Sequence, residues 1–442
     1  MDKTFDFDKT YSMLIVIIIS IFAFFEYLLP NSFSYLLLVC CLVLQLINQF
    51  SKHDKMLYLN SHLKISFLIL LFIFLQIITS LRSIYLLNSI KVVVFRSLLF
   101  VIGILMMFMD TWYRQGLKIL FVFSGIHVFS TIWSLVSYST FSALILTRLP
   151  QNISEMSMFF KIRGSYSGIT DQTGTNSYFI AVAVAIAFGK FLGSKNNKSR
   201  LKWGIYLFVS LVSLFLTSKR GALLAVLISS FVMLALYIRS QNRTLFIKLL
   251  KIVPAVLLTL LLMFIIFPDT LAPFIATRQK LVSGDVTSGR FSLYLQAIDM
   301  FFEKPLLGWG SGVYNSLFDT GTHNAYLQVL SENGIIGLSI FVIILIYNLY
   351  FTIKCYQKLT TQVHNIEGIS LTFSIFYQMF FILDALTANS LNDGFVVIIY
   401  LLASSIPYIM TKNQYSKPKY FNKSSLAYKL KNKDAKPTLL YR

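Results

Sequence analysis

The sequence predicts an all-α fold, a polytopic membrane helix bundle with about twelve transmembrane helices. Of the 442 residues, 56% are hydrophobic and only 13% are charged, and the mean hydropathy is +0.70. Soluble proteins carry roughly 25% charged residues. The apolar residues form runs close to the roughly 20 residues that a helix needs to cross the hydrocarbon core. Because lipid offers the backbone no hydrogen-bond partner, such runs are expected to be helices.

The predicted spans follow one another along the whole chain, so residues 1–442 are predicted to form a single polytopic membrane domain. They lie near residues 11–29, 33–49, 65–79, 92–109, 119–139, 176–193, 203–217, 222–239, 252–268, 334–353, 368–385 and 395–410. No A-x-A-like cleavage site follows the first run, which is therefore predicted to be a retained span and not a removed signal peptide.

The positive charge of the chain predicts its orientation. A net charge of +21 would suggest nucleic acid as the partner of a soluble chain. Here most basic residues lie in short loops and in the tail 411–442, and one side of the predicted layout holds more than twice as many as the other. The positive-inside rule then places both termini in the cytoplasm. We expect a basic cytoplasmic tail that contacts membrane lipids, and no nucleic-acid partner.

Two connections on the predicted outer side are long, 140–175 and 269–333. Long loops in compact proteins are usually functional or disordered. In the second loop, residues 289–305 have apolar side chains at helical spacing, which predicts an amphipathic helix on the membrane surface. A second short helix is predicted to begin behind Thr322 as N-cap and to end at Asn333–Gly334.

Four basic residues of the predicted outer side are candidate functional groups: Arg163, Arg220, Arg290 and His323. Guanidinium groups bind phosphate in bidentate fashion, and a histidine can accept a proton near neutral pH. Such a set at an outer membrane surface suits a lipid-linked pyrophosphate and an attacking hydroxyl. Three of them also have a plain alternative: Arg220 snorkelling at a helix end, Arg290 contacting headgroups, and His323 as an ordinary interfacial histidine. Arg163, in a polar loop, is uninformative by itself.

Other polar residues give weaker signals. The cysteines have neither disulfide nor zinc spacing, and no metal site is predicted. Glu332 and Asp319 flank the predicted histidine helix, where they could orient His323 or compensate its charge. Glu26 and Asp384 stand near predicted span ends, where carboxylates hint weakly at proton coupling.

One stretch resembles a known family. The run "GRFSLYLQAIDMFFEKPLLGWGSGVYNSLFDTGTHNAYLQVLSENGIIGL" (289–338) is similar to the signature region of the O-antigen ligase and Wzy-type polysaccharide polymerase superfamily. The shared features are an arginine, an amphipathic stretch, P-L-x-G-x-G, H-N-x-Y-L and E-x-G-I-x-G. Upstream, "TSKRGALLAVL" (217–227) resembles the S-R-G segment of the family, with Lys219 inserted. The run "IRGSYSGITDQTGTNSYF" (162–179) resembles its R-x-x-G…N segment more loosely.

The resemblance implies a GT-C-like, inverting glycosyltransferase that needs neither metal nor cofactor. It implies as donor an oligosaccharide linked to undecaprenyl pyrophosphate, used at the outer face of the bacterial cytoplasmic membrane. Residue by residue, His323 matches the catalytic base, and Arg220 and Arg290 match pyrophosphate-binding arginines. Substrate-binding positions are carried over at Arg163, Asn324 and Tyr326, of which the last two more readily orient the loop than react.

The motifs do not separate a polymerase, which uses another lipid-linked repeat unit as acceptor, from a ligase, which uses a different anchor. The Lys-, Asn-, Ile- and Phe-rich composition is common in low-GC organisms, which favours polymerisation of a capsular or O-antigen-like polysaccharide. A chain-length regulator and a flippase are further expected partners. Two other classes stay open, a lipid-linked oligosaccharide flippase or other transporter and a non-catalytic assembly scaffold. Transporters usually place their polar residues near the midplane of repeated halves.

Overall fold

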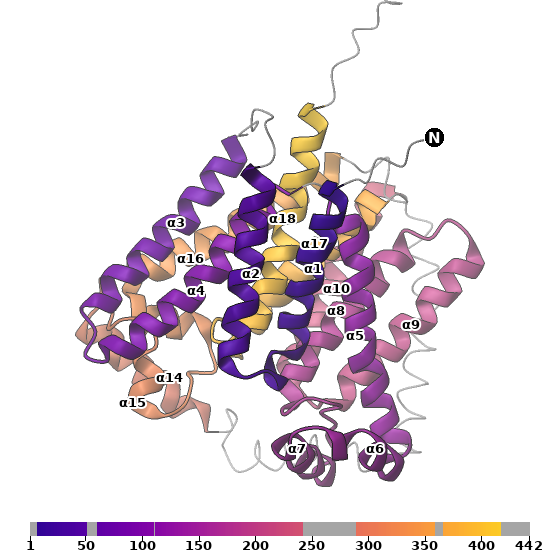
Figure 1. Cartoon of the computed structure of the whole chain (residues 1–442), viewed down its shortest axis with the longest axis horizontal. Coiled ribbons are helices and arrows are strands. Elements are labelled where there is room, and N and C mark those ends of the chain that lie inside the picture. The colour runs from indigo at the N-terminus through magenta and orange to yellow at the C-terminus, as the bar shows by residue number, and fades with distance from the viewer. Residues whose placement is uncertain (1–6, 51–59, 110, 242–288, 359–365, 417–442) are drawn as a thin grey trace, which may run out of the picture.

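The chain folds as a bundle of membrane-length helices, seen in a computed structural model that describes residues 7–109, 111–241, 289–358 and 366–416, apart from 51–59. Eleven helices in these ranges are long and apolar enough to cross a membrane, and the same ranges contain no strand. The predicted all-α polytopic fold class is confirmed (Figure 1). The predicted span 252–268 lies outside the described residues.

Five membrane-length helices form the N-terminal part of the bundle. They are α1 (Phe7–Phe25), α2 (Asn31–Phe50), α3 (Asn60–Leu81), α4 (Leu86–Met106) and α5 (Tyr113–Val136). Six more follow: α8 (Thr173–Leu192), α9 (Asn197–Leu216), α10 (Arg220–Gln241), α16 (Ala325–Lys358), α17 (Ile366–Asp384) and α18 (Gly394–Ser416). Apolar side chains cover the outside of the bundle, among them Phe67, Leu87, Phe129 and Phe231, which are all more than half exposed. This is the surface expected of a protein whose solvent is lipid.

Shorter helices gather at one end of the bundle, opposite the end where α1 begins and α18 ends (Figure 1). The predicted loop 140–175 includes most of α6 (Tyr138–Leu144) and all of the 3-10 turn η2 (Leu146–Arg148) and α7 (Gln151–Ile162). The second predicted loop contains α14 (Arg290–Glu303) and α15 (Val313–Phe318). The amphipathic helix predicted within 289–305 is therefore confirmed as α14. Residues 269–288 of that loop lie outside the described residues.

The most enclosed helices are α8, α17 and α18, in which 78%, 72% and 94% of the residues in the most apolar stretch are buried. Helix α17 packs on α8, α10, α16 and α18, which makes it the centre of the C-terminal part. It ends at Asp384, and α18 begins at Gly394. The short connection 385–393 is therefore anchored at both ends in the best-packed part of the protein, at the same end of the bundle as α14.

Helix α16 is interrupted at Gly334, which has φ +66° and ψ −170°. This agrees with the predicted end of the short helix at Asn333–Gly334, although helical structure resumes and runs to Lys358. A Cβ atom at Gly334 would overlap the carbonyl of Leu306. A glycine is thus required both by the backbone angles and by the close approach of the preceding loop.

Candidate active site at the end of the bundle

His323 is held from outside its own helix. Its backbone N–H donates to the Asn389 side-chain oxygen at 2.6 Å, and its φ is +52°, a value that non-glycine residues adopt uncommonly. Gly321 lies so close to the Asn389 amide that a Cβ atom there would overlap it. The His323 side chain is half-buried, and its imidazole makes no hydrogen bond with any residue that the structure describes. Its ring nitrogens thus have no partner in the described ranges.

The surroundings of His323 keep its imidazole uncharged. Burial lowers the pKa of His323 below its ordinary value of 6.5, and the charges of Arg290 and Lys219 lower it further. An imidazole with a depressed pKa is neutral at pH 7, which is the form that can accept a proton. Burial first, and the cationic neighbours in addition, thus favour the neutral form that a general base requires.

Arg290 is the first residue of α14 and reaches the same connection. Its Nη1 donates to the Thr387 carbonyl at 3.0 Å, while the half-buried guanidinium forms no ion pair within the described ranges. The left-handed backbone of Gly289 (φ +81°) directs the chain into α14 immediately before it. One hydrogen bond therefore orients the guanidinium, and most of its five N–H donors have no partner within the described part of the chain.

Asn324 and Tyr326 hold the start of α16. The Asn324 side-chain oxygen accepts from the backbone N–H groups of Tyr326 at 3.0 Å and Leu327 at 3.1 Å. Asn324 is thus the N-cap of α16, and the prediction of Thr322 in that role was wrong, because the Thr322 hydroxyl is bonded to the Asn324 backbone. The Tyr326 hydroxyl donates to the Ile382 carbonyl at 2.9 Å. These contacts position the loop, and substrate binding by either residue stays a prediction.

The turn between α9 and α10 contributes two adjacent cations of different exposure. Arg220, the first residue of α10, is exposed, whereas the preceding Lys219 is half-buried and acts electrostatically on His323. Gly221 packs directly on the Thr387 side chain, where a Cβ atom would overlap. The start of α10 therefore lies on the same connection as Arg290 and His323. The resemblance to the S-R-G segment identifies Lys219 only as an inserted residue.

Arg163 lies at the end of α7, where its exposed guanidinium stacks over the Phe159 ring at 3.9 Å. The following loop is tied to the end of α9, because the Tyr166 N–H donates to the Leu216 carbonyl at 2.9 Å. The described contacts of Arg163 are with α7 and not with His323 or Arg290. Its role in binding substrate stays a prediction.

Buried carboxyl groups lie near the basic groups, and Asp384 acts on the charge of Lys219. Asp384 is 3% exposed and accepts a hydrogen bond from Ser390 at 3.4 Å. Burial raises the pKa of Asp393 to about 7, and the neighbouring carboxylates of Asp384 and Asp171 raise it too. Asp171 comes from the loop before α8, so three separate segments meet here. The sequence drew attention to Asp384 only, because it stood near a predicted span end.

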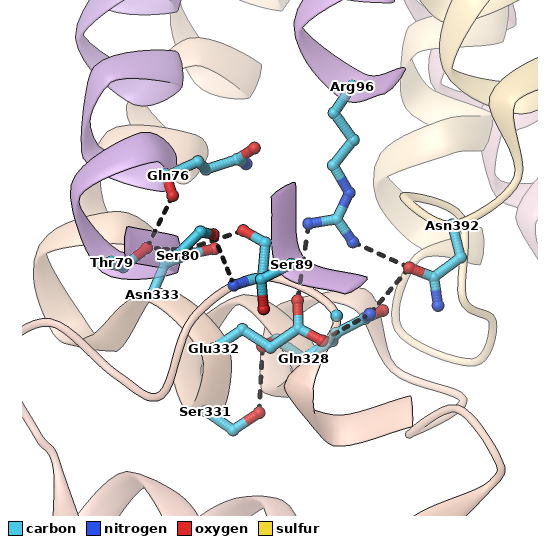
Figure 2. Close-up of polar contacts among 12 residues, drawn as sticks. Gln76, Thr79, Ser80, Ser89, Arg96, Gln328, Ser331, Glu332, Asn333 and Asn392 are labelled. Atoms are coloured by element: carbon cyan, nitrogen blue, oxygen red, sulfur yellow. Dashed lines mark hydrogen bonds and ion pairs between the residues drawn. The ribbon is translucent and has the colours of Figure 1, made fainter. Parts of the chain in front are cut away.

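Glu332 was suggested to orient His323, but its described contacts are with Arg96 and Gln328. It lies 3.5 Å from Arg96 of α4, with both side chains buried (Figure 2). Arg96 also donates to Asn392 at 2.8 Å, and Gln328 donates to Glu332 at 3.1 Å and to Asn392 at 2.8 Å. The network fastens α4, α16 and the 385–393 connection to one another. Arg96 lies inside a predicted span, and its charge there was the available signal.

Part of the chain that carries these groups is similar to a known protein family. Residues 205–342, about a third of the chain, match the family model described as O-antigen ligase. Residues 205–342 are thus similar to O-antigen ligases. This region runs from α9 into α16 and includes Arg220, Arg290 and His323, so the resemblance to the superfamily is confirmed. A search of curated proteins finds no match.

Proposed function

We propose that this multi-pass membrane protein polymerises a bacterial surface polysaccharide, capsular or O-antigen-like. The similarity of residues 205–342 to O-antigen ligases supports function of the ligase and polymerase type in general. The proposed reaction transfers a glycan from undecaprenyl pyrophosphate to the hydroxyl of another lipid-linked repeat unit. The proposed location is the outer face of the cytoplasmic membrane, with the end of the bundle that carries α14 facing outwards and both termini in the cytoplasm.

The observation that carries the proposal is the convergence of His323 and Arg290 on the connection 385–393. His323 is bonded to Asn389 and Arg290 to Thr387, while the imidazole and most guanidinium donors have no partner among the described residues. A neutral base near a cation is the pair that an acceptor hydroxyl and a pyrophosphate leaving group require.

In the proposed step the acceptor oxygen attacks the anomeric carbon of the donor sugar. The bond from that carbon to the pyrophosphate oxygen breaks, and its electron pair leaves with undecaprenyl pyrophosphate. His323 takes the hydroxyl proton, which contributes typically 10²–10⁴-fold. Arg290, together with Arg220 as the family motif suggests, balances the charge that develops on the leaving group. The attack inverts the anomeric configuration, and neither nucleotide, cofactor nor metal takes part.

The position of the site argues against transport. The candidate groups lie at one end of the bundle, on loops and helix starts, whereas transporters usually bind substrate near the bilayer midplane. We therefore place the membrane-embedded lipid tail of the donor beside the bundle and its pyrophosphate at the bundle end. A flippase that delivers this donor and a chain-length regulator are the proposed protein partners.

The test is a deletion strain complemented with wild type, His323→Ala, Arg290→Ala or the exposed control Lys161→Ala on α7. Lipid-linked and surface glycans are resolved by size. We expect single repeat units stranded on lipid at the outer face for the first two variants and wild-type product for the control. Long chains left on undecaprenyl pyrophosphate would mean a ligase. Units trapped on the cytoplasmic side would indicate a flippase, and full activity of both site variants would refute the catalytic assignment and favour a scaffold.

A further inference from the structure

Lys219 is the inward-facing member of the cation pair between α9 and α10. It is half-buried, whereas Arg220 beside it is exposed. Its side chain lies against Gly174 in the first turn of α8, where a Cβ atom would stand 3.4 Å from Lys219 Cε and 3.5 Å from Nζ. The ammonium group therefore lies within van der Waals reach of the start of α8.

The ammonium group of Lys219 has charged neighbours but no bonded partner. Within the ranges that the structure describes, it forms no hydrogen bond, and no carboxylate oxygen lies within 4 Å of it. Arg290 and Asp384 both act on its charge, and burial together with Arg290 lowers the pKa of Lys219 while Asp384 opposes this. A half-buried cation beside a second cation is unfavourable, and since the pKa of Lys219 is lowered overall, Asp384 offsets this only in part, which favours binding of a further anion.

We propose that Lys219 is a direct ligand of the donor pyrophosphate, sharing that anion with Arg290 beside His323. This inference rests on the proposed function and adds to it a residue that the family motif does not contain. Gly221, two residues further on, packs on Thr387, whose carbonyl holds Arg290, so the turn that carries Lys219 has a fixed position relative to Arg290. The two cations are brought to one place by α9–α10, α14 and the connection 385–393.

The two cations have complementary properties. The guanidinium of Arg290 is a planar fork that binds two phosphate oxygens in fixed directions. The ammonium of Lys219 is a compact point charge with rotatable donors on a flexible stem. It can follow the oxygen on which charge accumulates as the sugar–phosphate bond breaks.

The test uses the full-length protein in liposomes with a lipid-linked oligosaccharide donor, and inorganic pyrophosphate as competing probe. Lys219→Met keeps the length of the side chain and removes its charge, and Lys219→Arg restores a charge. We expect Lys219→Met to lower kcat/KM by at least about tenfold and to raise the inhibition constant of pyrophosphate by a similar factor, as loss of one charged contact implies. Lys219→Arg should recover most of both, and Lys161→Ala should change neither.

The outcomes separate this inference from the proposed function. If Lys219→Met leaves pyrophosphate inhibition unchanged while Arg290→Ala weakens it, Lys219 is not a ligand and the function stands. If the loss of turnover in Lys219→Met relative to wild type changes with the phosphatidylglycerol content of the liposomes while pyrophosphate inhibition does not change, Lys219 binds a lipid headgroup and the inference fails. If His323→Ala and Arg290→Ala are also fully active, the proposed function itself fails. Thermal unfolding in detergent identifies a variant that is inactive because it is misfolded, and in that case Lys219→Gln takes its place.

Discussion

The backbone N–H of His323 donates to the Asn389 side-chain oxygen at 2.6 Å, across 66 positions of sequence. The proposed base is thereby attached to the connection between α17 and α18, two of the most buried helices. Catalysis tolerates little displacement, since about 1 Å can cost 10²-fold in rate. The position of the histidine accordingly depends on an amide that lies outside the 205–342 family match.

Asn389→Ala is expected to lower kcat by about 10–100-fold, because the His323 loop loses the bond that fixes it. Asn389→Asp keeps an acceptor at the same place and should retain much more activity. It also brings a negative charge towards the imidazole, which should move the acid limb of its pH profile to higher pH. Turnover in liposomes across pH 5–8 measures both effects. Equal losses in the two variants would contradict the positioning role.

The pH dependence of kcat/KM should show activity lost as the medium becomes acidic. Since the pKa of His323 lies below 6.5, the imidazole is neutral at pH 7 and is protonated only as the pH falls below that value. Arg290→Gln removes a positive charge that lowers this pKa, so its residual activity should fall away at a higher pH than in wild type. A pH–rate profile of both proteins checks the direction. An acid limb that moves to lower pH would contradict the assigned electrostatics.

Arg96→Leu should destabilise the fold strongly, because Glu332 is left buried without its cation. Breaking such a pair typically costs about 3–5 kcal/mol. The double variant Arg96→Leu/Glu332→Leu should recover part of that loss. Arg114 and Glu367 offer a matched control, since this pair is 2.8 Å apart with side chains 54% and 25% exposed. Arg114→Ala is expected to cost at most about 1 kcal/mol. Thermal unfolding in detergent compares all three, and an equal loss in the two single variants would refute the argument.

Two glycine substitutions separate backbone strain from crowding. Gly334→Ala has both a positive φ and an overlap with the Leu306 carbonyl, so we expect large destabilisation or failure to fold. Gly289→Ala has φ +81° but no atom within 4 Å of the added Cβ, so only about 1–2 kcal/mol of backbone strain is expected. The difference in unfolding temperature between the variants measures the contribution of the close approach. Similar unfolding temperatures would mean that the segment around Leu306 can move away from Gly334 at little cost.

The sequence by itself determined the features that depend on local pattern. Runs of apolar residues predicted the membrane helices, and apolar spacing within 289–305 predicted α14. Both predictions are possible because a helix that contacts lipid needs its apolar residues within one continuous stretch of sequence. The motif around His323 likewise predicted the family. The same local reasoning placed the N-cap at Thr322 instead of Asn324. Both side chains can cap a helix, and the backbone conformation decides which of them does. Nor did the local reasoning detect the helices α6 and α7 in the first long loop.

Only the tertiary structure decided which distant groups meet. Arg96 contacts Asn392 across 296 positions, and His323, Arg290 and the start of α10 are gathered by the connection 385–393, which carries no motif of its own. It also placed Lys219 inward and Arg220 outward, although the two are adjacent in sequence. The physical reason is that hydropathy fixes where a helix crosses the membrane, whereas its rotation and the partners of its end loops follow from side-chain packing throughout the bundle.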